Sequence, residues 1–272
     1  MKAKVLLILI ILSVGCADVG RERPPLVVVL SFDYEGLFPG SDAYMWPVLD
    51  LLERHNATAT FFVMGRRAEL NPGMVREIHR RNHSMGLHTY YHNFPLFSEE
   101  DAAIIAGVYN KSVEYEWNRS FRTKYAFYED MLMNQRAVMN ATGNMSTPTM
   151  FRSPSLVVSW TRDPAYFEVL KEAGIEIDSS IYQDFNDPRP FYRIDGIIEV
   201  PVVASEKRLQ DTRKAYELAE KTAEAGVPLV LYIHPQNMDE AMIQKMDAYL
   251  TALEARYNVT YLQVEDVPAH YS

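Results

Sequence analysis

The sequence predicts an α/β fold, a distorted (β/α) barrel with seven or eight parallel strands. Short apolar runs rich in Val, Ile and Phe alternate with helical patterns almost from end to end. This alternation is typical of a parallel sheet whose strands are joined by helical crossovers. An apolar content of 48% over 272 residues suffices for a substantial core. No linker or repeat divides the chain, so we expect one catalytic-sized domain over residues 26–268.

Eight runs are predicted to be strands, because each is short, apolar and rich in β-branched or aromatic residues. They are Leu26–Phe32, Thr58–Val63, Ser84–His88, Thr149–Arg152, Ile175–Asp178, Ile197–Val202, Leu229–His234 and Thr260–Val264. The helical patterns between them are Ala43–Arg54, Met74–Arg81, a long stretch within Ser98–Thr142, Ala165–Ala173, Leu209–Ala225 and Ala241–Arg256. The connection around residues 98–149 is longer than a crossover helix needs, which predicts a helical insertion. A helical hairpin and one long bent helix both fit it.

Residues 1–20 have the pattern of an export signal. Lys2 and Lys4 precede an apolar run that is too short for a comfortable membrane span of about 20 residues. Cys16 follows this run and is the only cysteine of the chain. A cleaved signal peptide, an uncleaved N-terminal anchor and a lipoprotein lipidated at Cys16 all remain open. Each predicts an exported protein, extracellular or at the cell surface, and the last two would attach it to a membrane.

The net charge of −9 argues against nucleic acid as a partner. Binding of phosphates needs a basic face, and the sequence has no cluster of Lys and Arg of that kind. The acidic balance says little about any other substrate.

Polar residues collect at the carboxyl ends of the predicted strands. They are Asp33 and Glu35 after the first strand, His88 and His92 after the third, Arg152 after the fourth, Asp178 at the end of the fifth and His234 at the end of the seventh. In a β/α barrel this is the face on which active sites are built. We therefore expect these side chains to converge although they are far apart in the sequence.

The strongest local signal is GLHTYYH, in which His88 and His92 stand four residues apart. If the segment turns helically after its strand, both imidazoles lie on one side and can share a metal ion. A carboxylate from the end of the first strand would be the third ligand. Two histidines and one acid leave a position open for water, as in catalytic zinc sites. His79 and His83 have the same spacing but belong to a basic helix end, and we expect both at the surface.

Seven motifs occur in the order and approximate spacing of a known family. They are LSFDYEG, TATFFVMG, HSMGLHTYYHNFP, FRSPS, GIEIDSSIY, EVPV and LYIHP. Over about Leu26 to Pro235 the chain resembles the polysaccharide deacetylases, carbohydrate esterase family 4. The resemblance implies a metal-dependent hydrolase that removes N-acetyl, or O-acetyl, groups from a cell-wall or surface polysaccharide. It also implies a divalent metal cofactor, with zinc the expected ion.

The resemblance assigns roles to the metal ligands and to the proton-transfer residues. Glu35, His88 and His92 would hold the metal. Asp33 would be the general base that takes a proton from the attacking water, and His234 would protonate the departing amine.

The resemblance gives four further residues supporting roles. Arg152 would orient the base carboxylate, and Asp178 would help set the charge around the site. A carboxylate near the acid histidine would keep that histidine protonated near neutral pH. Ser155 would lie beside a backbone N–H that holds the developing oxyanion, in the region that binds the sugar. Leu231 would line the acetyl pocket.

Two positions depart from the family pattern. The family's commonest first motif has adjacent aspartates, whereas Tyr34 separates Asp33 from Glu35 here. Residues i and i+2 of a strand share a face, so both acids can point at one ion and either could be the base. At Ser155 the family more often has a tyrosine, and a neighbouring aromatic such as Trp160 or Tyr182 would have to fill that space.

Two other functions remain open at this point. Related barrels change substrate through their loops, so the chain could be an amidase acting on another C–N bond in a small metabolite. It could also be a non-catalytic glycan-binding barrel. Export favours a glycan over a metabolite, and a binding module has no physical need for a base and an acid on opposite sides of a metal.

Overall fold

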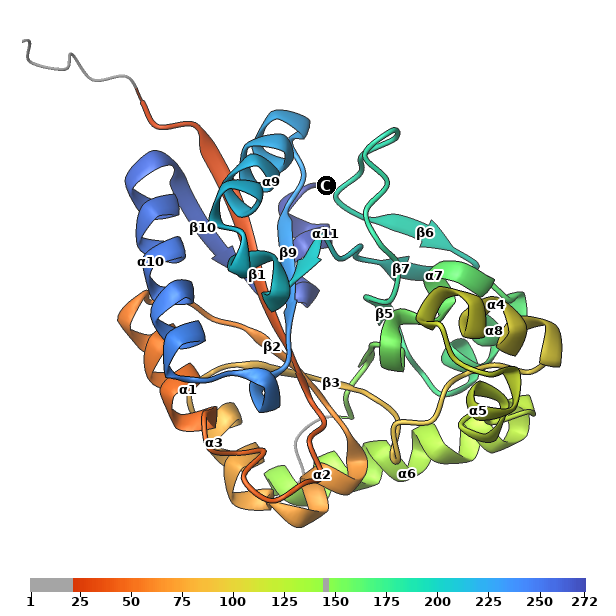
Figure 1. The fold of residues 1–272 in the computed structure, drawn as a ribbon. Helices are drawn as coiled ribbons and strands as arrows, with labels where there is room; N and C mark the ends of the chain where they lie inside the picture. Colours follow the sequence, from red (N-terminus) through yellow and green to blue (C-terminus); the bar gives the residue numbers. More distant parts are fainter. Residues whose placement is uncertain (1–21, 144–146) are drawn as a thin grey trace, which may run out of the picture.

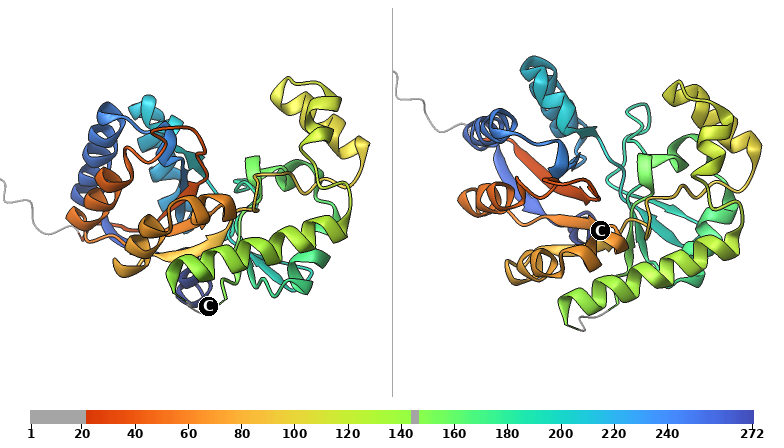
Figure 2. Two further views of the ribbon diagram at one scale, coloured as in Figure 1. Left: turned by 90° about the horizontal axis from the view of Figure 1, so that it is seen from below. Right: turned by 60° about the horizontal axis from the view of Figure 1, so that its bottom comes forward.

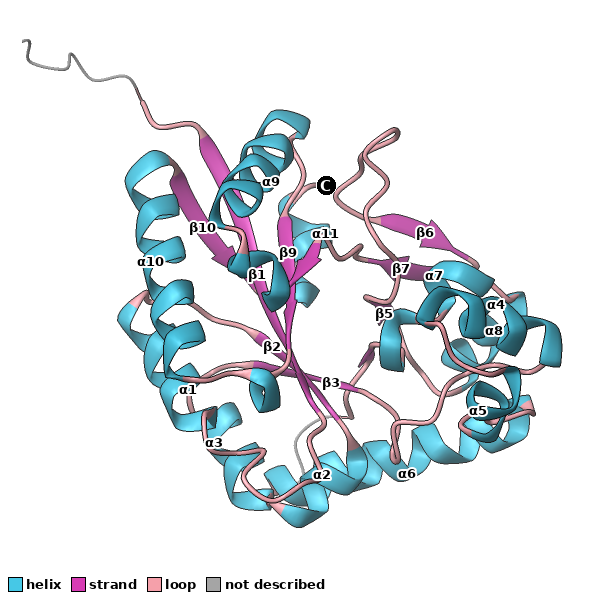
Figure 3. Ribbon diagram, in the orientation of Figure 1, coloured by secondary structure: helices cyan, strands magenta, loops and turns pink. Residues whose placement is uncertain are grey.

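The computed structural model describes residues 22–143 and 147–272. The predicted export signal at residues 1–20, with Cys16, lies outside the described residues. A curled sheet of ten strands runs through the molecule, and helices cover its outer side (Figures 1 and 3). Figure 2 shows the same arrangement from two further sides. Within the described ranges, no helix is long and apolar enough to cross a membrane.

The strands of the sheet are short, apart from the first. They are β1 (Pro25–Tyr34), β2 (Thr60–Val63), β3 (Ser84–Leu87), β4 (Met150–Phe151), β5 (Ile177–Asp178), β6 (Tyr192–Ile194), β7 (Ile197–Glu199), β8 (Ala204–Ser205), β9 (Leu229–Ile233) and β10 (Asn258–Leu262). Their order across the sheet is β6-β7-β5-β4-β3-β2-β1-β9-β8, and β10 pairs with β1. All pairs are parallel except β6 with β7.

Helices connect most of these strands. They are α1 (Met45–Arg54), α2 (Gly65–Leu70), α3 (Pro72–Arg80), α4 (Glu99–Tyr109), α5 (Val113–Asn118), α6 (Lys124–Thr142), α7 (Val158–Thr161), α8 (Pro164–Glu172), α9 (Thr212–Ala225), α10 (Glu240–Arg256) and α11 (Val267–His270). Four 3₁₀ turns complete the set: η1 (Pro154–Leu156), η2 (Glu206–Gln210), η3 (Pro235–Asn237) and η4 (Val264–Asp266).

Strand β1 organises the sheet because it pairs with three others. It lies beside β9 on one edge; on its other edge, residues 25–29 pair with β10 and residues 31–34 pair with β2. Every residue of β1 after Pro25 is buried. A parallel strand covered on both faces has a nearly continuous apolar sequence, which explains why this run predicted a strand.

The side chains of β1 alternate between two apolar clusters. Leu30, Phe32 and Tyr34 belong to the larger cluster, which includes the buried sides of the helices. Val27 and Val29 belong to a smaller cluster inside the curl of the sheet, together with side chains from β2, β4 and β9. Since side chains two apart share a face, the polar residues that continue the second series point to the inside of the curl.

The sheet bends back on itself where the chain leaves β7. Val202 N donates to Ile181 O at 2.9 Å, and Val203 N donates to Val230 O at 2.8 Å. Residues 202–203 thus join the segment after β5 to strand β9. The predicted distorted α/β barrel of parallel strands is confirmed, and the predicted strand Ile197–Val202 is β7 followed by this bridging segment.

Residues 98–143 form three helices, not a hairpin or one bent helix. Each begins at a side chain that accepts a backbone hydrogen bond three residues ahead: Ser98 for α4, Ser112 for α5 and Thr123 for α6. Helix α4 packs on a small apolar cluster with Phe94 and Val157 that is separate from the main core. Helix α6 is the longest and runs along one side of the molecule (Figure 1).

Candidate active site

The predicted metal ligands meet at the carboxyl ends of β1 and β3. The Oε2 atom of Glu35 lies 2.8 Å from His88 Nε2 and 2.6 Å from His92 Nε2. One ligand atom from each residue lies within 4.8 Å of the others, a spacing that suits a single ion. The structure therefore brings together the acid and the two histidines that the sequence selected.

The two histidines converge through a bend and not through the helical turn that we expected. Thr89 and His92 have left-handed φ angles of 53° and 63°, and the two imidazole rings are 5.2 Å apart. The start of α2 holds this bend, because Gly65 N donates to Thr89 O at 3.1 Å. A Cβ on Gly65 would lie 2.5 Å from the ring of Tyr90, so this close approach requires glycine.

The hydrogen bonds around the cluster suit a cation. His88 Nδ1 lies 2.9 Å from the carbonyl oxygen of Arg152, which can only accept, so Nδ1 carries a hydrogen and Nε2 is left as the nitrogen that faces Glu35 and would bind a metal ion. Gln236 Nε2 donates to the other carboxylate oxygen of Glu35 at 2.8 Å. Burial opposes ionisation of Glu35, but hydrogen bonds from His88 and His92 hold its pKa well below the ordinary value. One carboxylate and two imidazole nitrogens at this spacing therefore fit a divalent metal ion.

Asp33 lies beside this cluster in a different environment. It is buried, and Arg152 Nη1 donates to its Oδ1 at 2.9 Å. The guanidinium of Arg152 is itself fixed by donation to Ser31 Oγ at 2.9 Å and to the carbonyl and hydroxyl oxygens of Ser179, both at 2.8 Å. The two acids of the first motif thus have separate partners: histidines for Glu35 and an arginine for Asp33.

Tyr34 separates these acids in sequence but not in space. Its side chain points to the opposite face of β1, where it is buried in the outer core and its hydroxyl donates to Asp42 Oδ1 at 2.7 Å. The alternation of a strand therefore puts Asp33 and Glu35 on the same face, as the sequence predicted.

His234 completes the group and has a carboxylate partner that the sequence analysis missed. Its Nε2 lies 3.7 Å from Asp33 Oδ2, and its Nδ1 lies 3.1 Å from Glu206 Oε2. Burial alone would lower the pKa of His234, but the hydrogen bond to Glu206 and the charges of Asp33 and Glu206 raise it to about 9. Glu206 follows β8 directly, so it also lies at a strand end, but that strand is only two residues long.

Asp178 lies away from His234, in a separate buried group. Tyr166 Oη donates to its Oδ2 at 2.8 Å, and Ser180 Oγ donates to its Oδ1 at 2.6 Å. The carboxylate that contacts His234 is Glu206. Any influence of Asp178 on the site therefore passes through other residues.

The two predicted substrate-binding residues occupy different places. Ser155 is half-buried with a left-handed φ of 54°, and its carbonyl oxygen accepts a hydrogen bond from Tyr109 Oη at 2.5 Å. Leu231 lies in the outer core and is 5% exposed, so the structure does not bring it to the cluster. Its neighbour Tyr232 packs on the inner side of the sheet.

An aromatic row extends from His234. The Tyr232 ring is 5.8 Å from His234 and 6.1 Å from Tyr182, with the two tyrosine hydroxyls 2.7 Å apart. Trp160, which is 46% exposed, lies 6.1 Å beyond Tyr182. The aromatics suggested as substitutes for a tyrosine at Ser155 are thus connected to the site.

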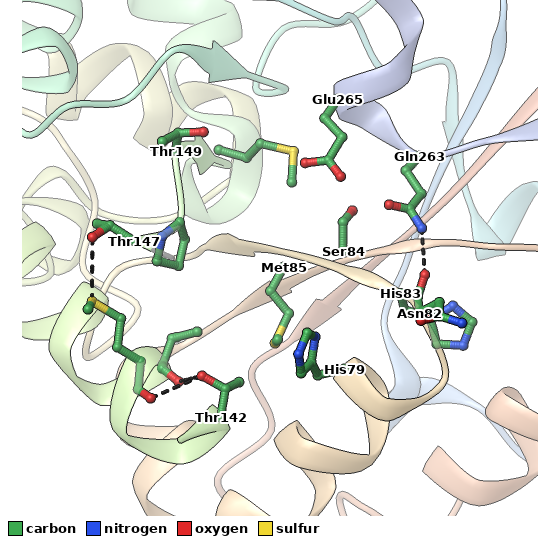
Figure 4. A pocket seen from close by; sticks show the side chains of 14 residues that line it. His79, Asn82, His83, Ser84, Met85, Thr142, Thr147, Thr149, Gln263 and Glu265 are labelled. Carbon is green, nitrogen blue, oxygen red and sulfur yellow. Dashed lines mark hydrogen bonds between the residues drawn. The ribbon is translucent and has the colours of Figure 1, made fainter. Parts of the chain in front are cut away.

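A cavity of about 310 Å³ lies at the other end of the strands (Figure 4). It is lined by Ser84 and Met85 at the start of β3 and by Thr149 before β4, so it is opposite the face that carries His88. His83 also lines it and is 5% exposed. The expectation that His83 is a surface residue is wrong, whereas His79 is exposed as predicted. Burial lowers the pKa of His83 to about 4.

The fold and the site define an α/β barrel with a candidate metal centre at the carboxyl ends of its strands. A family model described as polysaccharide deacetylase matches residues 20–177. The chain therefore belongs to the polysaccharide deacetylase family, as the motifs had suggested.

Individual relatives agree with this assignment. The chain is 28% identical over 194 residues to "Peptidoglycan-N-acetylglucosamine deacetylase PgdA" of Listeria monocytogenes, which covers 71% of this chain and 33% of the relative. This chain thus spans about a third of that relative's length.

Solved structures share the fold. A Mycobacterium smegmatis protein described as a polysaccharide deacetylase superposes with a TM-score of 0.65 at 17% identity, covering 92% of this chain and 90% of the other. A family 4 carbohydrate esterase from Streptomyces lividans gives a TM-score of 0.53 at 15% identity, covering 86% and 91%.

Proposed function

We propose that this chain is a metal-dependent deacetylase that removes N-acetyl groups from a cell-wall or surface glycan. One observation carries the proposal: the Glu35, His88 and His92 cluster lies directly beside the Asp33–Arg152 pair and His234. A ligand set, a base and an acid at one barrel end are what hydrolysis of an amide requires. The name of the Listeria relative supports an acetylated amino sugar as substrate.

Glu35, His88 and His92 would hold the divalent ion, and we expect zinc because imidazole and carboxylate ligands suit it. When bound, such an ion supplies Lewis-acid chemistry, which polarises a carbonyl and lowers the pKa of water. For His88 the nitrogen that would face the ion is Nε2, since its Nδ1 hydrogen is donated to Arg152 O.

Asp33 would be the base. Arg152 binds its Oδ1, and its Oδ2 faces His234. The Oδ2 atom is thus the one that would accept the proton of the attacking water. The arginine contributes orientation, because it is buried and bound on several sides.

His234 would be the acid. With a pKa of about 9 it carries a proton at neutral pH, and Glu206 binds Nδ1 so that the Nε2 hydrogen faces Asp33. From there Nε2 would donate its proton to the departing amine. The base and the acid would thereby act on the same tetrahedral centre.

The test is acetate release from chitin oligomers, peptidoglycan, acetylated xylan and small N-acetylated metabolites. We expect release from an N-acetylated glycan, loss of that release after chelation and recovery on addition of zinc. Release from small amides alone would favour a metabolite amidase. Glycan binding without acetate release by the metal-loaded protein would favour a non-catalytic barrel.

We also infer export, with the protein extracellular or at the cell surface. The support is the Lys-led apolar run at residues 1–20. Cell fractionation of the full chain and of a Cys16→Ser variant tests it. Release of only the variant from the membrane indicates lipidation at Cys16, and a cytoplasmic location of both contradicts export.

A further inference from the structure

A pair of buried acids lies behind the catalytic group. Asp178 on β5 and Glu199 on β7 are partners in the parallel ladder, and both are 0% exposed. Side chains at partner positions of neighbouring strands stand on the same face of the sheet, so the two carboxyl groups are neighbours. Two ionised carboxylates offer only acceptors, so a hydrogen bond between them requires that one of them carry a proton.

The surroundings supply no cation to balance two charges. Among the described residues, no Lys, Arg or His forms an ion pair with Asp178 or Glu199. A doubly ionised pair would therefore be an uncompensated buried charge, which is very costly. The other titratable group facing the pair is Tyr166 from α8, and its hydroxyl donates to Asp178.

The hydrogen bonds distinguish the two acids. Both oxygens of Asp178 accept hydroxyl donors, from Tyr166 and Ser180. Oε1 of Glu199 accepts from the backbone N–H groups of Ser180 and Ile181, both at 2.9 Å, whereas Oε2 has no donor within the described structure. Oε2 is thus the free position for the proton. Burial raises the pKa of Glu199 well above its ordinary value and raises that of Asp178 to about 6.

The pair is connected to the candidate base through Ser179 and Arg152. Glu199 binds the backbone N–H groups directly after Ser179. Ser179 in turn accepts from Arg152 through its carbonyl and hydroxyl oxygens, and its hydroxyl donates to Val200 O at 2.8 Å. Arg152 then binds Asp33.

We propose that Glu199 is protonated, donates its hydrogen to Asp178, and is a positioning residue that holds Ser179 and Arg152 in place for Asp33. The positioning role rests on the proposed function of Asp33, whereas the shared proton does not. Glu199 and Asp178 act through Arg152 and do not touch the reacting atoms.

Glu199→Gln, Asp178→Asn and Glu199→Leu test the shared proton through thermal unfolding at several pH values. A glutamine keeps the acceptor and replaces the O–H donor by N–H, so Glu199→Gln should unfold near the wild-type temperature at acidic pH. Asp178→Asn puts an N–H₂ group against one of the two hydroxyl donors and should unfold at a clearly lower temperature. Glu199→Leu should also be destabilised, because two backbone N–H groups lose their acceptor.

The pH dependence supplies a second criterion. Unfolded Glu199 ionises near its ordinary pKa of about 4.3 while folded Glu199 stays protonated. The wild type should therefore lose stability relative to Glu199→Gln as the pH rises from about 4 towards the raised pKa. If Glu199→Gln and Glu199→Leu lower the unfolding temperature equally, Glu199 is ionised in the wild type. If Asp178→Asn unfolds near the wild-type temperature and Glu199→Gln unfolds at a clearly lower one, the proton is on Asp178. Either result overturns the assignment.

The positioning role is read from the metal-loaded protein. In Glu199→Leu we expect kcat to fall by about tenfold or more, as for a displaced catalytic group, with KM and zinc content unchanged. Glu199→Gln should restore kcat, and Glu265→Gln, at the other end of the strands, is the control. Unchanged kcat in Glu199→Leu overturns positioning.

One readout does not depend on activity. The buried Nε–H of Arg152, assigned by its loss in Arg152→Lys, should give an exchange-protected ¹⁵N signal in the wild type and in Glu199→Gln. It should shift or lose protection in Glu199→Leu. If no glycan is deacetylated but the signal behaves in this way, the proposed function fails and the positioning of Arg152 stands. If the signal is unchanged in Glu199→Leu, the positioning is wrong whatever the activity.

Discussion

The two halves of the candidate active site are built differently. The metal half consists of Glu35 and two histidines on a bend. Glu35 and His92 are partly accessible, at 16% and 22%, whereas His88 is buried at 1%. The proton-transfer half is centred on Asp33 and Arg152, whose side chains are 4% and 0% exposed. Each member of the metal half has one hydrogen-bond partner outside the cluster: Arg152 O for His88, Gln236 for Glu35 and Arg119 for His92. Arg152 alone makes four such bonds, to Ser31, Asp33 and Ser179.

This difference agrees with the roles proposed for the two halves. Metal ligands need only present donor atoms at one distance from a common point, and the ion itself completes their geometry. A base must hold one oxygen towards one proton, and the chain alone provides that orientation. The metal half can therefore remain open to substrate, while the proton-transfer half is fixed by a buried network.

The largest expected effect follows from removal of a metal ligand. His88→Ala and His92→Ala should lose the ion, and kcat/KM should fall by about 10³-fold or more, because metal catalysis contributes several kcal/mol. Metal content by mass spectrometry and acetate release measure both. His79→Ala, an exposed histidine, is the matched control. Full activity of His92→Ala after dialysis against a chelator would contradict the assignment of the metal ligands.

The next effect separates the two acids. Asp33→Asn should keep its metal and lose about 10²–10⁴-fold in kcat, since it can no longer accept a proton. Glu35→Gln should lose metal affinity, because a charged ligand becomes neutral. Metal content by mass spectrometry and acetate release distinguish the two roles. If Asp33→Asn loses the ion and Glu35→Gln keeps it without turnover, the two roles are reversed.

A smaller, pH-dependent effect is expected from Glu206→Gln. In the wild type, activity should fall as the pH rises through about 9, where His234 loses its proton. The variant loses the carboxylate bound to Nδ1 of His234, so the basic limb of its pH–activity profile should move to lower pH. On that limb, each unit by which the pKa of His234 falls should lower the activity roughly tenfold.

The free energy of unfolding should also fall as the pH rises through the pKa of His234. The folded pKa of His234 is raised, so its contribution to stability is complete below the unfolded pKa of about 6.5 and is lost as the pH rises through about 9. Glu206→Gln should reduce this contribution. Glu224→Gln, an exposed carboxylate on α9, is the control. An unchanged basic limb in Glu206→Gln would show that another group is the acid.

The sequence was sufficient to predict site residues that follow long apolar strands. The long apolar run of β1 identified the centre of the sheet, and its alternation predicted that Asp33 and Glu35 share a face. It failed for Glu206, because this residue follows β8, a strand of two residues that no apolar run reveals. It also failed for the bend at Thr89 and His92, because Thr89 is held in its left-handed conformation by a hydrogen bond from Gly65 across the fold.

The smallest effect on activity is expected at Leu231, and it tests the two faces of β9. Because Leu231 lies in the outer core, Leu231→Ala should lower the free energy of unfolding by about 2–5 kcal/mol, as for other buried leucines. KM and the preference for acetyl over longer acyl groups should remain unchanged in the folded protein, since the side chain that faces the inner side is Tyr232. Denaturant unfolding and assays with acetyl and propionyl substrates measure both quantities. If Leu231→Ala instead admits propionyl substrates at little cost in stability, Leu231 lines the acetyl pocket as the family resemblance implies. The acetyl pocket would then extend to the face of β9 that carries Leu231.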